Sequence, residues 1–315
     1  MMPFVATPTR ARILVFSDVP KWLGYKELVL RYRPDLVLLA GDVTSDGFAT
    51  FWSEALERIP AFRRKKQELA CEYDIEIHRD NFFKISDRDK WNQFSNRLDD
   101  SREEYRNSQE FHAARRALHV EPFYSFLRFA GRRATVFVVK GDHDDDFPGD
   151  YDVDRINSLR GCAEISGKAI EAHGLRLLGL GFNETHYKRV LRDLVARFAG
   201  AVDILVAHSE QPRVPILAEF RPRLIARGHF GYGRFLVKGI PSIFTGGRFY
   251  SIARVGRSMS ITQYKRGFGE GSASRPRKFD GANCRPWFSE ASEFEKYPWL
   301  KPYHQVPGTS GEPSW

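Results

Sequence analysis

Short apolar runs recur along the chain, and several of them end abruptly in a glycine or an ionisable side chain. The clearest run covers residues 134–139 and is followed at 140–144 by the sequence Lys-Gly-Asp-His-Asp. The runs 36–40 and 204–207 end in a similar way. Such runs are typical of strands buried on both faces of a sheet. Because ligands of open α/β sheets bind beyond the carboxyl ends of the strands, the polar residues at these ends are the first candidates for chemistry.

The amino-terminal part of the chain has the pattern of a β-α-β unit. The run 12–16 predicts a first strand, and apolar residues at helical spacing predict a helix over 21–32, which Pro34 closes. A second strand is predicted over 35–40. Because a connecting helix lets two strands run parallel in one sheet, this part predicts an α/β fold.

A long charged segment separates the second predicted strand from the run 134–139. Residues 51–119 contain 14 Lys and Arg and 14 Asp and Glu, with aromatic residues scattered among them. One crossover helix needs far fewer residues than this segment holds. We therefore expect amphipathic helices inserted at about residues 50–120. The basic run 63–66 is more typical of a solvated helix face than of a phosphate grip.

The second half of the chain predicts further strands. A strong strand is predicted over 175–180 and a helix over 187–198, and the remaining strands are predicted over 202–207, 223–226, 234–238, 241–245, 249–255 and 259–264. The last four look like short antiparallel strands joined by glycine turns. After residue 266 the chain is rich in Gly, Ser, Pro and Trp, so we expect one domain over 1–266 and an irregular extension over 267–315, packed on it.

The composition points to a cytoplasmic protein with an anionic partner. The chain of 315 residues has a formal net charge of +9, and residues 213–315 hold 17 Lys and Arg against 7 Asp and Glu. Its 3 cysteines form no Cys-x-x-Cys pair, which argues against a disulfide framework and against a cysteine zinc site. We expect neither a signal peptide at residues 1–12 nor an apolar run long enough to cross a bilayer.

Polar residues at the predicted strand ends form a candidate metal site. In chain order they are Asp18, Asp42, Asp142 with His143 and Asp144, His208 and His229. Carboxylates and imidazoles on one rim suit manganese, iron or zinc. Each residue also has an ordinary explanation, since an aspartate can cap a helix and a histidine can be satisfied inside a core. Adjacent glycines at 41, 141 and 228 would allow sharp turns and a close approach of the ligand.

In order and spacing these segments resemble the motifs of the calcineurin-like metallophosphoesterases. The matching segments are Ser17-Asp18-Val19-Pro20, Gly41-Asp42-Val43, Gly141-Asp142-His143-Asp144, Ala207-His208-Ser209 and Gly228-His229-Phe230-Gly231. The resemblance covers roughly residues 10–265, without most of 50–120. It implies an α/β (α+β) sandwich of four layers, in which two mixed β-sheets are flanked by helices.

The resemblance implies one complete metal set and one depleted set. The complete set is Asp42, Asp142, His208 and His229, with Asp142 at the position of the family's asparagine. The other set keeps Asp18 and the shared Asp42, because Pro20 and Gly231 stand where the family has histidines. We expect one tightly held divalent ion, manganese first and iron or zinc as alternatives. A second ion recruited with the substrate phosphate is the other possibility.

The resemblance also implies roles in catalysis. His143 would stabilise the transition state or protonate the leaving oxygen, and Asp144 would orient its imidazole. Arg227, Arg234 and Arg248 would hold substrate phosphate. The expected function is hydrolysis of a phosphomonoester or phosphodiester, with a phosphorylated small molecule or nucleotide as substrate. The alternatives are an inactive phosphoesterase-like scaffold that binds a protein partner, and a nuclease acting on nucleic acid.

Overall fold

The fold of this chain is given by a computed structural model. The residues it describes are 11–19, 22, 24–44, 49–77, 83–84, 87–182, 193–194, 196–197, 202–208, 220, 222–229, 232–237, 240–245, 249–255, 259–265 and 277–279. The chain divides into two compact units, one made of Met1–Asp46 and Phe123–Trp315 and the other of Gly47–Pro122. The second unit covers nearly the same residues as the predicted insertion.

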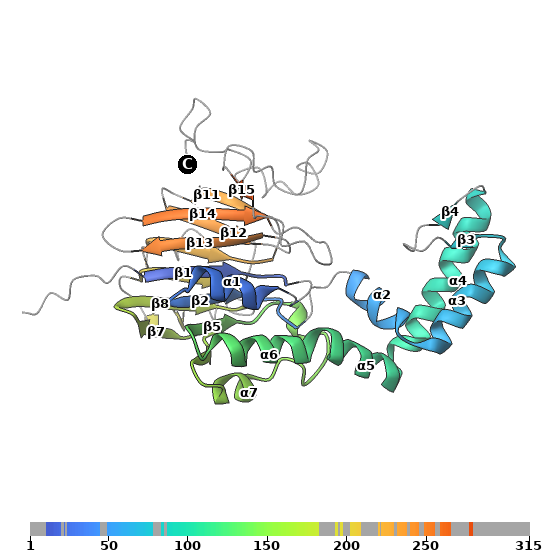
Figure 1. Cartoon of the computed structure of the whole chain (residues 1–315), viewed down its shortest axis with the longest axis horizontal. Helices are drawn as coiled ribbons and strands as arrows, with labels where there is room; N and C mark the ends of the chain where they lie inside the picture. The colour runs from blue at the N-terminus through green and yellow to red at the C-terminus, as the bar shows by residue number, and fades with distance from the viewer. Residues whose placement is uncertain are drawn as a thin grey trace, which may run out of the picture. The chain divides into compact units, whose positions relative to one another are not determined.

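The first sheet is mixed. Its spatial order is β15-β14-β13-β1-β2-β5-β6, and Figure 1 labels all of these strands except β6. Four of these strands run parallel to one another, namely β1 (Ala11–Phe16), β2 (Leu36–Ala40), β5 (Thr135–Val139) and β6 (Cys162–Glu164). Antiparallel pairing adds the other three, which are β13 (Phe249–Val255), β14 (Met259–Lys265) and β15 (Arg277–Phe279).

The second sheet is mixed as well, with the order β11-β12-β10-β9-β8-β7. Its parallel centre consists of β8 (Leu175–Leu180), β9 (Ile204–Ala207), β10 (Leu224–Arg227) and β12 (Ile240–Thr245). The edges are formed by the antiparallel strands β7 (Ala169–Ala172) and β11 (Tyr232–Val237). The parallel strands β1, β2, β5 and β9 are nearly continuous runs of apolar residues, as expected where both faces are covered.

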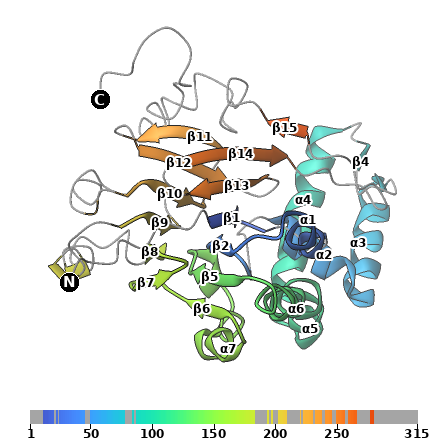
Figure 2. The same ribbon diagram turned by 60° about the vertical axis from the view of Figure 1, so that its left-hand side comes forward.

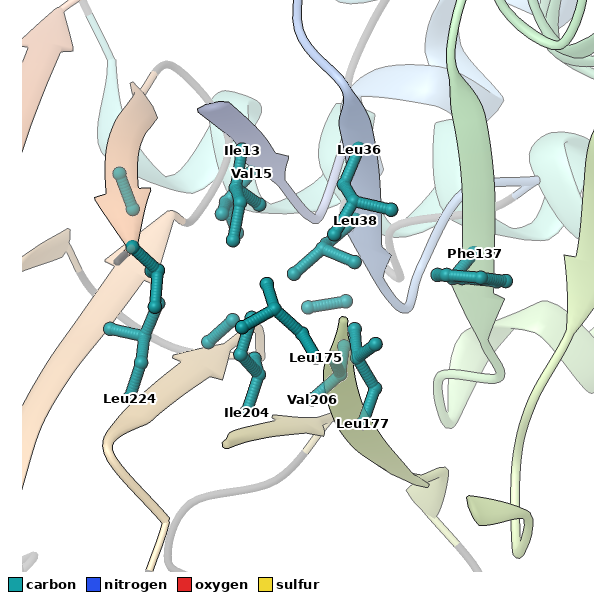
Figure 3. Close-up of a cluster of buried hydrophobic side chains, with 14 of the residues drawn as sticks. Ile13, Val15, Leu36, Leu38, Phe137, Leu175, Leu177, Ile204, Val206 and Leu224 are labelled. Carbon is teal, nitrogen blue, oxygen red and sulfur yellow. The ribbon is translucent and has the colours of Figure 1, made fainter. Parts of the chain in front are cut away.

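The main hydrophobic core lies between the two sheets. Figure 3 shows side chains of β1 and β2 in the first sheet pointing toward those of β8, β9 and β10 in the second. The alternate residues of each strand point away from this core, so Ile13 and Val15 face it, whereas Phe16 lies on the outer face of the first sheet. A smaller cluster on the outer face of the second sheet joins Leu178, Leu205 and other residues to Leu194 and Phe220.

Helices cover the outer face of the first sheet (Figure 2). These are α1 (Tyr25–Tyr32) and α6 (Glu121–Ala130). The ring of Phe16 meets Tyr25 of α1 at 4.9 Å and Phe126 of α6 at 5.8 Å between centroids. Trp22 stacks on Phe126 at 4.7 Å. The short helix α7 (Val153–Ser158) follows the loop after β5. Two sheets flanked by helices confirm the predicted sandwich class.

The second unit is mainly helical. It contains α2 (Ala49–Glu57), α3 (Pro60–Glu72), α4 (Arg88–Arg106), α5 (Gln109–Arg115), the π-helical turn Arg116–Val120, and a small hairpin of β3 (Glu76–Ile77) and β4 (Phe83–Lys84). Phe62 of α3 meets Tyr105 of α4, and Phe94 is fully buried between Tyr73 and Trp91. The regularly placed aromatic residues of this segment are therefore the core of a helical unit.

Several expected elements need correction or stay untested. The strand β15 pairs with β14, so regular structure continues past residue 266, contrary to expectation. The rest of the extension over 267–315 and most of the helix expected over 187–198 lie outside the described residues. No helix in the described part of the chain is long and apolar enough to cross a membrane.

Candidate metal centre

Four ligand-type side chains converge at the carboxyl ends of four parallel strands. Asp42 follows β2, Asp142 follows β5, His208 follows β9 and His229 follows β10. One potential ligand atom from each of the four lies within 4.8 Å of those of the others. Two strands come from each sheet, so the site spans the edge of the sandwich. The structure thus brings together the complete metal set that the sequence resemblance implied.

Asp142 is the common partner of the two histidines. Its Oδ1 atom lies 2.8 Å from His208 Nε2 and 3.1 Å from His229 Nδ1. Burial alone would raise the pKa of Asp142, but the hydrogen bonds with His208 and His229 hold it well below its usual range. An anionic carboxylate therefore stands at the position where the resemblance implied a neutral asparagine.

The orientation of His208 is set by the main chain of β2. Its Nδ1 lies 2.7 Å from the carbonyl oxygen of Ala40. Because a carbonyl only accepts, Nδ1 carries a proton and Nε2 is directed to the acids Asp142 and Asp42, the latter at 3.4 Å. Burial opposes a charge on this fully buried ring, yet the carboxylates of Asp42 and Asp142 raise its pKa well above the ordinary value. This is the arrangement of a histidine ligand with its outer nitrogen anchored.

The donor set fits a divalent cation. Two carboxylates and two imidazoles supply oxygen and nitrogen ligands, which suit manganese, iron or zinc. The carboxylates of Asp42 and Asp142 stabilise the charged form of the buried His208 imidazole, so positive charge is favoured at this position. A cation bound by Asp42, Asp142, His208 and His229 would provide that charge.

The backbone adopts left-handed conformations at three positions of the site. Asp18, Asp42 and His229 have φ angles of 48°, 52° and 81°. Such conformations are uncommon outside glycine and cost roughly 1 kcal/mol or more each. Residues held in this way tend to cluster at functional sites.

Close packing explains the glycines beside these residues. A Cβ atom on Gly141 would overlap the Asp42 carboxylate, and one on Gly228 would overlap the carbonyl oxygen of Ala40. Gly41 has a φ of +84°, and a Cβ atom there would overlap the ring of His208. These glycines therefore permit the close approach of the neighbouring site residues, and the close approach of a ligand stays a prediction.

Asp144 does not orient His143, and that prediction was wrong. Its carboxylate is fully buried and accepts hydrogen bonds from the N–H groups of Gly141, Asp42, Val43 and Thr44 and from the Thr44 hydroxyl, at 2.8 to 3.0 Å. Burial raises the pKa of Asp144 to about 6 against the effect of these donors. Asp144 ties the loop after β5 to the loop after β2, and it thereby fixes Asp42 relative to Asp142.

His143 borders the centre and has a different carboxylate partner. Its Nε2 lies 3.4 Å from Asp142 Oδ2, and its Nδ1 lies 3.2 Å from Asp146 Oδ2. The hydrogen bond with Asp146 raises the pKa of His143 to about 9. Sequence reasoning missed Asp146, although the run of three acids at 144–146 offered a signal: a tight turn after His143 brings the residue three positions later beside it.

Asp18 lies at the site but is not one of the four converging ligands. It is buried, and its Oδ2 accepts the N–H of His229 at 3.0 Å. Burial raises the pKa of Asp18 to about 7. Its carboxylate thus holds the turn that presents His229. Pro20 and Gly231, the positions at which the second metal set is depleted, lie outside the described residues.

The predicted phosphate-binding arginines are not supported as a group. Arg227 is the last residue of β10 and is fully buried, which does not fit contact with a substrate. The side chain of Arg234 and all of Arg248 lie outside the described part. His173 is exposed, and its Nε2 lies 3.2 Å from Thr135 Oγ1 at the amino end of β5, away from the metal centre.

We compared the chain with protein families, with curated proteins and with solved structures. No family model matches the chain, and no curated protein matches its sequence. Among solved structures it is similar to TT1561 of Thermus thermophilus, with a TM-score of 0.43 and 10% identity over 80% of this chain and 98% of that one.

Proposed function

We propose that this chain is a metal-dependent phosphoesterase that works with one divalent cation. The observation that carries the proposal is the convergence of Asp42, Asp142, His208 and His229, with His143 at the border of the same site. Manganese is the proposed ion, with iron or zinc as alternatives. Asp18 is proposed to support the site by holding His229, with recruitment of a second ion as a lesser role.

The residues divide the chemistry among them. A divalent cation bound there supplies Lewis-acid stabilisation of the negative charge on a phosphoryl group. The imidazolium of His143 faces the centre through Nε2 and is placed to give its proton to the leaving oxygen. Asp144 keeps the two ligand-bearing loops in register through its five hydrogen bonds.

The proposed substrate class rests on the net positive charge of residues 213–315. The excess of Lys and Arg in residues 213–315 favours an anionic substrate, for which we propose a phosphorylated small molecule or a nucleotide. Nucleic acid is the alternative substrate. A nuclease would bind with an affinity that falls steeply with salt concentration, which separates the two cases.

An inactive binding scaffold is the second candidate function. The observation that favours it is in the sequence, where Pro20 and Gly231 deplete the partner metal set and Asp142 adds a negative charge to the remaining one. An added carboxylate makes a bound cation a weaker Lewis acid. In that case the sandwich would serve to bind a protein partner.

One experiment separates enzyme from scaffold. The metal content of the purified protein is measured, and hydrolysis of p-nitrophenyl phosphate and bis-p-nitrophenyl phosphate is followed with manganese. We expect one metal ion per chain, and a loss of activity of at least about a hundredfold in His143→Ala. His173→Ala, at the exposed amino end of the strands, is the matched control and should keep full activity. Absence of both metal and activity with manganese, iron and zinc would overturn the proposal.

A further inference from the structure

We infer that Asp146 is the residue that positions His143, by accepting a hydrogen bond from Nδ1 and so directing Nε2 to the metal centre. The inference deepens the proposed function, because it concerns the proton donor of that reaction. It replaces the pairing of His143 with Asp144 that the sequence suggested.

The local turn places the two side chains together. His143–Asp145 form a single turn of 3-10 helix, and the N–H of Asp146 donates to the carbonyl oxygen of His143 at 3.2 Å. In such a turn, residues three apart lie on the same side. Both carboxylate oxygens of Asp146 accordingly lie within reach of His143 Nδ1, at 3.2 and 3.4 Å.

The other two acids of the same run are engaged elsewhere. Asp144 is buried and accepts hydrogen bonds from the loop after β2. Asp145 pairs with Lys140 at 2.5 Å and is largely exposed. Three consecutive aspartates thus have three different partners, and the one that faces the imidazole of His143 is Asp146.

The hydrogen bond decides which nitrogen exchanges protons. A carboxylate accepts but does not donate when ionised, so Asp146 keeps the proton of His143 on Nδ1. The other nitrogen, Nε2, then faces Asp142 at 3.4 Å. In the proposed hydrolysis the oxygen of a water molecule forms a bond to phosphorus and that water releases a proton to solvent. The bond from phosphorus to the leaving oxygen breaks as the Nε2 proton of His143 moves to that oxygen. His143 is left as a neutral imidazole. Its remaining proton is on Nδ1, which donates a hydrogen bond to Asp146.

The direct test reads the tautomer of His143 in the metal-free protein. Protein labelled with ¹⁵N at histidine is compared with Asp146→Ala and with the control Asp145→Ala, and the signals of His143 are assigned from His143→Ala. At a pH where the ring is neutral, we expect wild type and Asp145→Ala to hold the proton on Nδ1. Asp146→Ala should shift toward the Nε2 tautomer, which dominates in free histidine. An identical tautomer in all three proteins would overturn the inference, whatever the activity.

A kinetic test asks whether this positioning serves proton donation. Phenyl phosphate is compared with p-nitrophenyl phosphate, because the poorer leaving group depends more on a proton donor. We expect Asp146→Ala to lower kcat for phenyl phosphate at least about tenfold, with a smaller loss for p-nitrophenyl phosphate. Asp146→Asn, which keeps an acceptor, should recover part of the loss, and Asp145→Ala should behave as wild type. Equal losses for both substrates would mean that Asp146 has a structural role alone.

The two tests fail separately. If wild type hydrolyses neither substrate while Asp146→Ala still shifts the tautomer, the proposed function falls and the positioning of His143 by Asp146 stands. If wild type is active but the tautomer is the same in every variant, the proposed function stands and the role of Asp146 falls.

Discussion

The two ends of the same parallel strands hold their histidines and acids in different ways. At the amino ends, Asp35 accepts the N–H of Arg12 at 2.7 Å, and the exposed His173 lies beside Thr135. Both of these contacts are exposed, and each joins an acid or a histidine to a main-chain N–H or a hydroxyl group. At the carboxyl ends, Asp142 is shared by His208 and His229. Residue types alone therefore do not distinguish a candidate metal site, whereas burial and the convergence of four ligand-type atoms do.

Residues with a left-handed backbone occur at both ends of the strands, but their surroundings differ. His173 has a φ of 52°, close to that of Asp42, but it sits in an exposed turn between β7 and β8. Asp42 is buried against its neighbours. Strained conformations at both ends become informative about function only together with dense packing, since an exposed turn tolerates them readily.

The largest expected effect is on metal affinity, from His208→Ala. Removing one of four converging ligands, with its anchor on Ala40, should weaken binding of manganese by at least about a hundredfold. His173→Ala, the matched change at the opposite end, should leave the affinity unchanged. Titration calorimetry of both variants measures the difference, and equal affinities would show that these four residues do not hold the ion.

A second prediction compares two glycines with nearly the same φ, Gly41 at +84° and Gly149 at +85°. Alanine costs about 1 kcal/mol at Gly149, where a Cβ atom meets nothing within 4 Å. At Gly41 it also overlaps the His208 ring, so the loss in free energy of unfolding should reach about 3 kcal/mol or more. Urea unfolding of both variants checks this. Equal losses would mean that the site is not tightly packed.

A third prediction concerns the carboxylate that joins the two ligand loops. In Asp144→Asn, an amide group replaces one of the two oxygens that accept five hydrogen bonds, which should cost about 2 kcal/mol of unfolding free energy. The exposed neighbour gives the control, since Asp145→Asn should change it by less than about 0.5 kcal/mol. If Asp144→Asn had the same free energy of unfolding as wild type, Asp144 would not be the residue that holds the two loops together.

The smallest effect is a pH dependence set by Asp146. The pKa of His143 is raised from 6.5 to about 9 in the folded chain. A raised pKa stabilises the folded state fully below the unfolded value of 6.5, and that contribution is lost as pH rises through 9. In metal-free protein, Asp146→Asn should therefore lower the free energy of unfolding more at pH 6 than at pH 10. If the free energy of unfolding fell by the same amount at pH 6 and at pH 10, the interaction between Asp146 and the charged His143 would be contradicted.

Much of the fold could be predicted because apolar runs determine where strands lie. The strands over 175–180 and 249–255 form as predicted, since each run is bounded by polar residues or glycines. The four converging ligands stand at the ends of such strands, and the family resemblance singled them out from the other polar residues there. Arg227 was placed outside its strand because the apolar run stops at residue 226, yet β10 includes it and buries it.

The partners of the three aspartates could not be predicted in the same way. Residues 144, 145 and 146 are all aspartates, so the sequence does not distinguish them. One turn of 3-10 helix decides that Asp146 is the one that faces His143. Hydrogen bonds from the loop after β2 to Asp144 join residues about 100 positions apart. Such contacts arise from the packing of the loops, which no local pattern encodes.

The most direct test of the account is the number of ions that the chain binds. Titration of metal-free protein with manganese should give one tight ion per chain, and Asp18→Asn should keep that stoichiometry, because Asp18 contacts the main chain of His229 and is not one of the four converging ligands. Two tight ions per chain, with one lost in Asp18→Asn, would contradict a centre built for a single ion. Absence of tight binding in the wild type would contradict a metal centre altogether.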